Sequence, residues 1–289
     1  MRQLIVNKNP DKKGLVIIEG KDFHYLRQVL RVKAGDMVNL RLSDGTLQNS
    51  TVCKIDDSSQ RITLQVCGAL RPFEGLRTTE PQGPRVVGGA STGVGGANSV
   101  VPEALEGASV DFTLFQFIPK PQKLELIVRQ ATECGVKNII PVISEYAQKG
   151  NVQALMGPKL ERLDRIVREA RQQSGSPVET KVFEPVTVEQ AVELWNKMKE
   201  EAGGEENAVG FVLSERAVDN GGRAVPEALE GPQVVCIFCG NEGGISPDEL
   251  ELLTKKALLR PLHFSVNILR CETAALYGIA VVQSAILGI

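Results

Sequence analysis

The pattern of apolar and polar positions differs between the two ends of the chain. In the C-terminal part, segments with the pattern of strands alternate with segments that have the period of helices. From residue 110 onward, short apolar runs of strand length alternate with longer segments whose apolar residues recur every three to four positions, as in amphipathic helices. The runs predict strands at residues 110–117, 138–144, 180–186, 208–215, 233–238 and 261–266. The longer segments predict helices at residues 122–134, 159–174, 187–201 and 246–257, and a last helix that begins after Arg270 within residues 267–287. Such alternation predicts an α/β fold with a parallel sheet covered on both faces.

Two of these helices carry clear start signals. Thr187 followed by Gln190, and Ser246 followed by Glu249, have the spacing of capping boxes, in which side chains at the helix start bond the free backbone N–H groups. Both helices are therefore expected to begin directly after the capping residue.

The first 68 residues have a different pattern, dominated by short β-branched runs. They predict strands at residues 14–20, 36–42, 47–55 and 61–68, with one helix at residues 21–32, which together suggest a small β-barrel. Residues 69–108 are rich in glycine and proline and have no period, as in a linker or insertion. We therefore expect three regions: a barrel at residues 1–68, a linker or insertion at 69–108, and an α/β domain at 109–289. The heptapeptide VPEALEG occurs at 101–107 and 225–231, where single helical turns are expected.

Composition adds little to this picture except exclusions. The 289 residues are 42% hydrophobic and 24% charged, as in a globular protein, and the formal net charge is −2, so any basic surface must be local. The first 20 residues contain no apolar signal-peptide core, and no apolar run reaches membrane-spanning length. These features predict a cytoplasmic protein without a membrane segment.

The six cysteines do not have the spacing of a disulfide framework or a metal site. Cys236 and Cys239 form a CxxC, but they lie in a predicted strand, where side chains three residues apart point to opposite faces. There is no second CxxC, and the only histidines are His24 and His263. We expect buried thiols, a reducing compartment and no metal.

A glycine cluster at residues 86–97 resembles the nucleotide loop of short-chain dehydrogenases. Gly89, Gly93 and Gly95 have a GxxxGxG spacing, but a dinucleotide loop must join a buried strand to a helix, and Pro102 would end that helix soon after its start. No tyrosine of the chain has a lysine four residues later, as that family's catalytic pair requires. A flexible linker is the stronger interpretation, and a dehydrogenase remains a minor alternative.

A second glycine cluster, CGNEGGISPDE at residues 239–249, joins a predicted strand to a capped helix. Gly240, Gly243 and Gly244 would let a ligand approach the backbone closely, at the sheet edge where α/β folds bind ligands. Glu242 disfavours a phosphate and favours a neutral or cationic ligand. A simple tight turn is the alternative.

The last predicted helix, NILRCETAALYGIAVVQSAIL, is apolar almost all round but starts with polar residues. Glu272 and Thr273 suit the free N–H groups of a helix start. Arg270 lies just before the helix, where its charge opposes the helix dipole, so capping does not explain it. A partner does: a carboxylate, a substrate oxygen or a phosphate.

Two predicted helices carry basic residues at regular spacing. In residues 159–174, Lys159, Arg162, Arg165, Arg168 and Arg171 recur every three positions among acidic residues. In the barrel, the cluster consists of His24, Arg27, Arg31 and Lys33. Either helix could present a solvated, salt-bridged face or follow an RNA backbone, and the sequence leaves both open.

Five motifs occur in the order found in RsmE-like methyltransferases of the SPOUT superfamily: FHYLRQVLRVKAGD, KLELIVRQATECGV, EARQQSG, GNEGGIS and NILRCETAALYG. The resemblance covers about residues 1–68 and 110–289. It implies a PUA-like barrel followed by an α/β domain with a C-terminal trefoil knot, and a homodimer. It also implies S-adenosylmethionine (SAM) as methyl donor, and N3 of a uridine in 16S RNA of the small ribosomal subunit as substrate.

The resemblance also implies roles for individual residues. Arg270 would stabilise charge on the uracil oxygens, and Glu272 would take the N3 proton, directly or through water, or orient Arg270. The SAM site would comprise Leu213, Gly240, Asn241, Glu242, Gly243, Gly244, Ile268, Leu269 and Thr273. RNA would contact His24, Arg27, Arg31, Lys33, Arg165, Arg168 and Arg171.

The chain departs from the family pattern at four positions. Asn241 replaces a proline, Cys271 a threonine, and Tyr146 and Ser176 two arginines. The missing basic residues bear on RNA binding more than on the SAM site. Methylation of another RNA position, and an inactive RNA-binding protein with the same fold, are the alternatives; the target nucleotide and the state of the substrate stay open.

Overall fold

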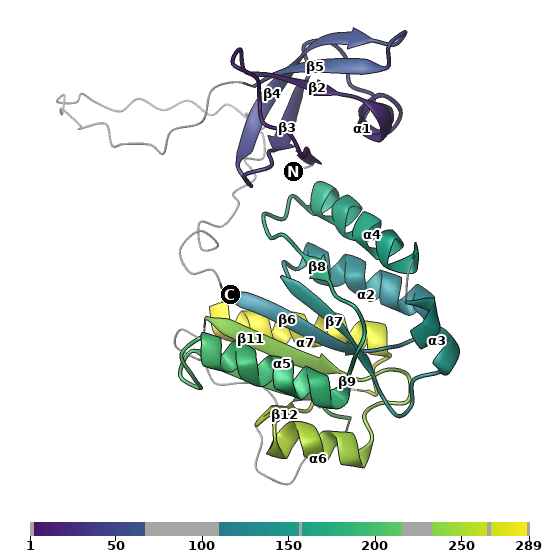
Figure 1. Cartoon of the computed structure of the whole chain (residues 1–289), viewed down its shortest axis with the longest axis vertical. Helices are drawn as coiled ribbons and strands as arrows, with labels where there is room; N and C mark the ends of the chain where they lie inside the picture. The colour runs from purple at the N-terminus through teal and green to yellow at the C-terminus, as the bar shows by residue number, and fades with distance from the viewer. Residues whose placement is uncertain (1–2, 67–109, 156–157, 216–232, 265–266, 288–289) are drawn as a thin grey trace, which may run out of the picture.

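The computed structural model describes residues 3–66, 110–155, 158–215, 233–264 and 267–287, which form two sheets with separate hydrophobic cores (Figure 1). The expected linker at 69–108, the glycine cluster at 86–97 and both copies of VPEALEG lie outside the described residues. None of the described helices is long and apolar enough to cross a membrane.

The N-terminal sheet is curled and has five strands in the order β1-β3-β4-β5-β2. Its strands are β1 (Gln3–Ile5), β2 (Leu15–Ile18), β3 (Met37–Arg41), β4 (Leu47–Asp56) and β5 (Arg61–Val66). Leu4, Leu40, Ile62 and Leu64 are fully buried at its centre. The expected barrel strands are confirmed, and β1, which pairs in parallel with β3, was not predicted because three residues are too short to show a period.

The helix expected at residues 21–32 is shorter and changes type. It comprises α1 (Gly20–His24) followed directly by a π-helical turn, η1 (Tyr25–Val29). Arg31 has a positive φ of 53°, a left-handed conformation that a right-handed helix cannot accommodate. The backbone therefore ends the helix before Arg31, although the apolar spacing continues to Val32.

The second sheet is parallel throughout, with the order β12-β10-β11-β6-β7-β8 and β9 paired to β7. Its strands are β6 (Asp111–Phe117), β7 (Asn138–Ile143), β8 (Lys181–Val182), β9 (Val186–Thr187), β10 (Ala208–Leu213), β11 (Val234–Cys239) and β12 (Arg260–Leu262). The strand expected at residues 180–186 is thus two short strands. Pro185 lies between them and lacks the N–H that a continuous ladder would need.

Helices cover both faces of this sheet, as the alternating pattern predicted (Figure 1). They are α2 (Pro121–Glu133), α3 (Lys149–Ala154), α4 (Pro158–Ser174), α5 (Val188–Glu201), α6 (Pro247–Lys255) and α7 (Cys271–Leu287). One apolar cluster joins the sheet to α2, α4 and α7, and the other joins it to α5 and α6. Both predicted capping boxes, at Thr187 and Ser246, are present.

Cys236 and Cys239 lie on opposite faces of β11, in the two different apolar clusters. Both are free and buried. Within the described part of the chain, no group of three or more histidine, cysteine or acidic residues could hold a metal ion.

The N-terminal sheet contacts the second domain where β1 and α1 lie against α4. The buried Gln3 side chain donates hydrogen bonds to the Arg171 carbonyl (2.9 Å) and the Ser176 carbonyl (3.1 Å) at the end of α4. One turn earlier, Arg168 pairs with Asp22 at 2.8 Å and donates to the Ile5 carbonyl at 3.1 Å. Hydrogen bonds and an ion pair, one of them fully buried, therefore hold the barrel on α4.

Gly210, in the middle of β10, gives a test of the packing between the sheet and the α5 face. A Cβ at this position would approach Leu259, Cys236 (2.8 Å) and Trp195 (3.0 Å), all core side chains. We expect Gly210→Ala to destabilise the fold by about 1–3 kcal/mol, the usual cost of overpacking a core. Urea unfolding measures this, with the change expected in the midpoint at constant slope.

Gly150→Ala is the matched control, because Gly150 lies in helix α3 with no atom within 4 Å of the added Cβ. It should leave the midpoint unchanged or raise it slightly. Equal midpoints for Gly210→Ala and the unmodified protein would show that the space beside β10 is larger than the structure indicates.

Candidate functional site

A pocket opens at the carboxyl ends of β10 and β11, between the glycine loop after β11 and the segment that leads into α7. Its volume is about 650 Å³, including solvent-open space at its mouth. Its walls combine loop backbone with mostly neutral side chains. The lining residues are Leu213, Ser214, Glu215, Cys239, Gly240, Asn241, Gly244, Ile245, His263, Phe264, Asn267, Ile268, Leu269, Cys271 and Ala274.

The glycine loop is folded back on itself by very close backbone packing. A Cβ on Gly240 would lie 2.9 Å from the Gly244 carbonyl carbon, and Gly244 has a positive φ of 79°. Only residues without a side chain allow this approach. The two glycines therefore shape the pocket wall.

Asn241 closes the turn with its side chain. Its Oδ1 accepts a hydrogen bond from the Gly243 N–H (2.8 Å), and its carbonyl accepts one from the Gly244 N–H (3.0 Å). Its Nδ2 donates to Ser144 Oγ (3.0 Å) at the end of β7. An asparagine can thus hold the loop where the family has a proline, because its side chain mimics a backbone turn.

Tyr146, which stands where the family pattern has an arginine, lies under the same loop. A Cβ on Gly243 would come within 2.9 Å of the Tyr146 Cβ, so the glycine backbone packs directly on this side chain. Tyr146 is still 46% exposed. The substitution therefore offers an aromatic ring at the loop in place of a positive charge.

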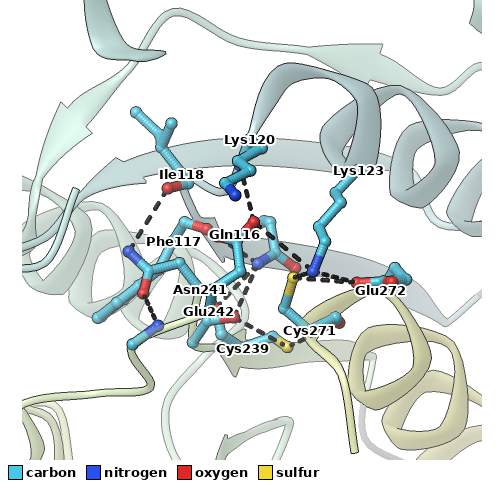
Figure 2. Close-up of polar contacts among 12 residues, drawn as sticks. Gln116, Phe117, Ile118, Lys120, Lys123, Cys239, Asn241, Glu242, Cys271 and Glu272 are labelled. Carbon is cyan, nitrogen blue, oxygen red and sulfur yellow. Dashed lines mark hydrogen bonds and ion pairs between the residues drawn. The ribbon is translucent and has the colours of Figure 1, made fainter. Parts of the chain in front are cut away.

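A charged cluster joins three distant segments beside this pocket (Figure 2). Lys123, in the first turn of α2, reaches between the glycine loop and the start of α7, with its Nζ 3.1 Å from Glu272 Oε2 and 3.6 Å from Glu242 Oε1. The Cys271 thiol donates to Glu272 Oε2 at 3.3 Å, and the Lys120 backbone N–H donates to Glu242 Oε1 at 3.2 Å. One cation therefore serves two carboxylates.

The contacts shift the pKa values of three members of the cluster. The hydrogen bond with Glu272 raises the pKa of Lys123. Burial works to raise the pKa of Glu272, but hydrogen bonds from its own N–H, Lys123 and Cys271 outweigh it and hold that pKa below its ordinary value. Burial, together with the bond to Glu272, raises the pKa of Cys271 to about 12. At neutral pH the cluster thus holds a cation, a carboxylate and a neutral thiol.

Gln116, at the end of β6, ties the sheet to the glycine loop. Its buried Nε2 donates to the carbonyls of Phe117 (2.9 Å), Cys239 (3.2 Å) and Gly240 (3.1 Å). This bond network fixes the position where the chain leaves β11 and turns toward the pocket.

The residues expected to bind a cofactor separate into two groups. Six of them line the pocket: Leu213, Gly240, Asn241, Gly244, Ile268 and Leu269. Glu242 belongs to the charged cluster, Gly243 packs on Tyr146, and Thr273 is exposed in the first turn of α7.

The two expected catalytic residues, Arg270 and Glu272, lie two positions apart in the chain but have different surroundings. Arg270 is exposed immediately before α7, and its carbonyl accepts the Ala274 N–H at 2.7 Å. Glu272 pairs with Lys123, and the described structure has no hydrogen bond or ion pair between the Glu272 and Arg270 side chains. Their catalytic roles stay predictions.

The basic residues expected to contact RNA also differ in their surroundings. Arg27 pairs with Asp57 (2.9 Å), Arg168 pairs with Asp22 at the domain junction, and burial lowers the pKa of the half-buried Arg171. The exposed members are His24, Arg31, Lys33 and Arg165. Three of the seven are therefore paired with a carboxylate of the protein or half-buried. RNA contact stays a prediction for all seven.

Lys123, Gln116, Ser144 and His263 were not singled out from the sequence. Lys123 begins the motif KLELIVRQATECGV, which is the one signal that could have found it. His263 lines the pocket with its Nδ1 3.2 Å from the Ser214 carbonyl, and nothing in its sequence context indicates this.

The family model for an RNA methyltransferase domain matches residues 106–283. The chain belongs to this family. Ribosomal RNA small subunit methyltransferase E of Rickettsia conorii is 31% identical over 171 residues, which cover 59% of this chain and 63% of that protein, less than two thirds of its length. Ribosomal RNA small subunit methyltransferase E 2 of Borreliella burgdorferi is 22% identical, with 97% of this chain and 96% of that protein covered. The resemblance inferred from the five motifs is confirmed.

The fold is also that of a solved member of this group. The crystal structure of a ribosomal RNA small subunit methyltransferase E from Neisseria gonorrhoeae, bound to S-adenosyl methionine, matches with a TM-score of 0.68. The match has 20% sequence identity and covers 99% of this chain and 98% of that one. At this identity the likeness establishes the shared architecture of curled N-terminal sheet and parallel α/β domain.

The rate at which the Cys271 thiol is alkylated tests its contact with Glu272 in the charged cluster. Because its pKa is raised to about 12, its reactive thiolate is scarce at pH 8, and we expect iodoacetamide to alkylate it far more slowly than the exposed Cys53. Glu272→Gln removes the charge that opposes ionisation, which lowers the pKa of Cys271 and should accelerate its alkylation between pH 8 and 10. Peptide mass spectrometry follows each site.

Glu251→Gln is the control, because Glu251 pairs only with Lys255 on the exposed face of α6. It should leave both alkylation rates unchanged. If Glu272→Gln also leaves the Cys271 rate unchanged, the hydrogen bond between these two residues does not control the thiol.

Proposed function

We propose that the protein transfers a methyl group from SAM to N3 of a specific uridine in 16S RNA of the small ribosomal subunit. The observation that carries the proposal is the pocket between the glycine loop and α7, next to an exposed arginine and a paired carboxylate, in a chain of the RNA methyltransferase family. The ribosomal RNA and the methyl donor follow the names of the Rickettsia, Borreliella and Neisseria relatives.

The side chains and the charge of the pocket suit SAM. Leu213, Ile245 and Ala274 offer apolar surface for an adenine ring, while the close approach of Gly240 to Gly244 leaves loop backbone open to polar groups. None of the described residues that line the pocket is a lysine or arginine, and the carboxylates of Glu215 and nearby Glu242 suit a cationic donor better than a phosphate. This disfavours the dinucleotide of the dehydrogenase alternative.

Bound SAM supplies an electrophilic methyl group on a sulfonium. The remaining task for the chain is to remove the weakly acidic N3 proton and to stabilise the negative charge that spreads to the uracil oxygens. Arg270 is exposed and offers a guanidinium for these oxygens. Glu272 is a carboxylate at neutral pH, because its pKa is lowered, and can accept the proton directly or through a water molecule.

Four finer features belong to the same proposal: the knot, the dimer, the roles of the two domains and the cellular compartment. The last helix is threaded through the loop after β11 as a trefoil knot, and two copies form a homodimer through the α7 region, where Ile268 is 80% and Tyr277 41% exposed. Residues 1–68 act as an RNA-binding barrel and 109–289 as the methyltransferase domain. The enzyme works in the cytoplasm, where small subunits assemble.

Two other functions remain testable alternatives. A methyltransferase for another RNA position would share the pocket and differ only in its product. An inactive RNA-binding protein would lack SAM binding, although the intact glycine loop and charged cluster disfavour this.

A bulky side chain in the pocket tests the donor site. Ala274 lines the pocket from the first turn of α7, and we expect Ala274→Phe to abolish the calorimetric heat of SAM binding by filling the space. The same substitution at the exposed Ala34 of the barrel is the control and should bind SAM normally. Unchanged SAM affinity in Ala274→Phe would place the donor elsewhere.

The product is tested in cells that lack the gene. Their 16S RNA should contain no methyl group at the target N3, and the unmodified gene should restore it, as measured by mass spectrometry of ribosomal RNA. Arg270→Ala should lose transfer by about 10²–10³-fold, the usual cost of removing one group that stabilises developing charge. Normal methylation by Arg270→Ala would remove its role, and an unchanged 3-methyluridine content without the gene would overturn the proposed reaction.

A further inference from the structure

Lys123 connects the glycine loop, which carries Glu242, to the start of α7, which carries Glu272. The proposed reaction needs both segments side by side. Lys123 lies on α2, 119 positions before Glu242 and 149 positions before Glu272 in the printed numbering, yet it contacts both carboxylates. In Figure 2 its side chain extends from α2 into the gap between the loop and the start of α7. The helix, the loop and α7 therefore meet at one ammonium group.

The cluster contains two carboxylates, Glu242 and Glu272, and one ammonium group, that of Lys123, which contacts both. Lys123 and Glu242 are 27% and 32% exposed, and Glu272 is only 15% exposed. Without the ammonium, two carboxylates would face each other across the space that it occupies. A carboxylate in such a position is held in place by its cation and would otherwise repel its neighbour or take up a proton.

We propose that Lys123 is the positioning residue of the methyl transfer: it holds Glu272 ionised and oriented toward the substrate, and it couples that carboxylate to the cofactor loop through Glu242. The inference rests on the proposed function, because Glu272 must be the group that accepts the N3 proton. Lys123 itself touches neither substrate nor donor in this scheme.

The other groups around Glu272 do not replace this cation. Cys271 donates a neutral thiol hydrogen bond, and Cys239 from β11 is a buried thiol that bonds the Cys271 carbonyl at 3.8 Å. Glu242 is of the same charge, and the Arg270 side chain makes no ion pair with Glu272 in the described structure. Loss of Lys123 therefore raises the pKa of Glu272, and a larger share of it becomes protonated as the pH falls.

The first measurement uses the free protein and does not depend on any reaction. Carbon-13 NMR of the carboxyl groups should show Glu272 titrating at higher pH in Lys123→Met than in the unmodified protein. Lys123→Arg, which keeps the charge, should return the titration most of the way. Lys137→Met is the matched control, because Lys137 pairs with Asp111 at 2.5 Å on the far end of β6 and should leave Glu272 unchanged.

The second measurement is the pH dependence of methyl transfer to small subunits. In Lys123→Met the acidic limb of kcat/KM should move to higher pH, so that the loss of rate is larger at pH 5.5 than at pH 8, while SAM affinity measured by calorimetry falls much less. A uniform loss at every pH, with the Glu272 titration unmoved, would reduce Lys123 to a structural brace and overturn the inference.

The outcomes separate this inference from the proposed function. If the unmodified protein transfers no methyl group to the RNA, the function fails whatever Lys123 does. If it transfers the group and Lys123→Met keeps both the NMR titration and the pH profile of the unmodified protein, only the role of Lys123 fails.

Discussion

The backbone contact between Gly240 and Gly244 is the constraint on which the site depends. Because no side chain fits between them, the chain leaves β11, reverses at once and enters α6 without filling the space in front of the sheet. Gln116 holds the start of this reversal, and Asn241 closes it. The pocket exists because the loop stays this small, and the charged cluster exists because the loop then carries Glu242 toward α2.

The two ends of the last helix, α7, have different roles: most of the helix packs in the core, and its first turn contributes to the charged cluster. Its apolar side chains, Ala275, Ile279 and Val282, are buried against the sheet, which fixes the position of the helix. Its first turn lies at the carboxyl edge of the sheet and presents Cys271 and Glu272 to Lys123. A buried helix can therefore begin with polar residues without instability, because Cys271 and Glu272 have partners there and Arg270 and Thr273 are exposed to solvent.

The sequence predicted the parts of the fold that depend on local period and helix capping. The strands β6, β7, β10 and β11 and the capped helices α5 and α6 fall within a few residues of their expected bounds. Periodicity could not show that Arg168 faces the barrel, since a solvated face and a domain contact have the same spacing. Likewise, the glycine spacing indicated the pocket, but the role of Lys123 depends on three segments that only the tertiary structure brings together.

The hydrogen bonds of Gln3 and the ion pair of Arg168 have a consequence for how a large substrate is selected. They join the barrel to α4 through contacts that are buried or partly buried, and these contacts restrict the separation between the barrel surface and the pocket. A substrate that touches both must present two features near that spacing, and a substrate with another spacing must bend to fit. Discrimination would then arise from the stiffness of the substrate as well as from its chemical groups, and a rigid assembled particle would be distinguished from a flexible strand of the same sequence.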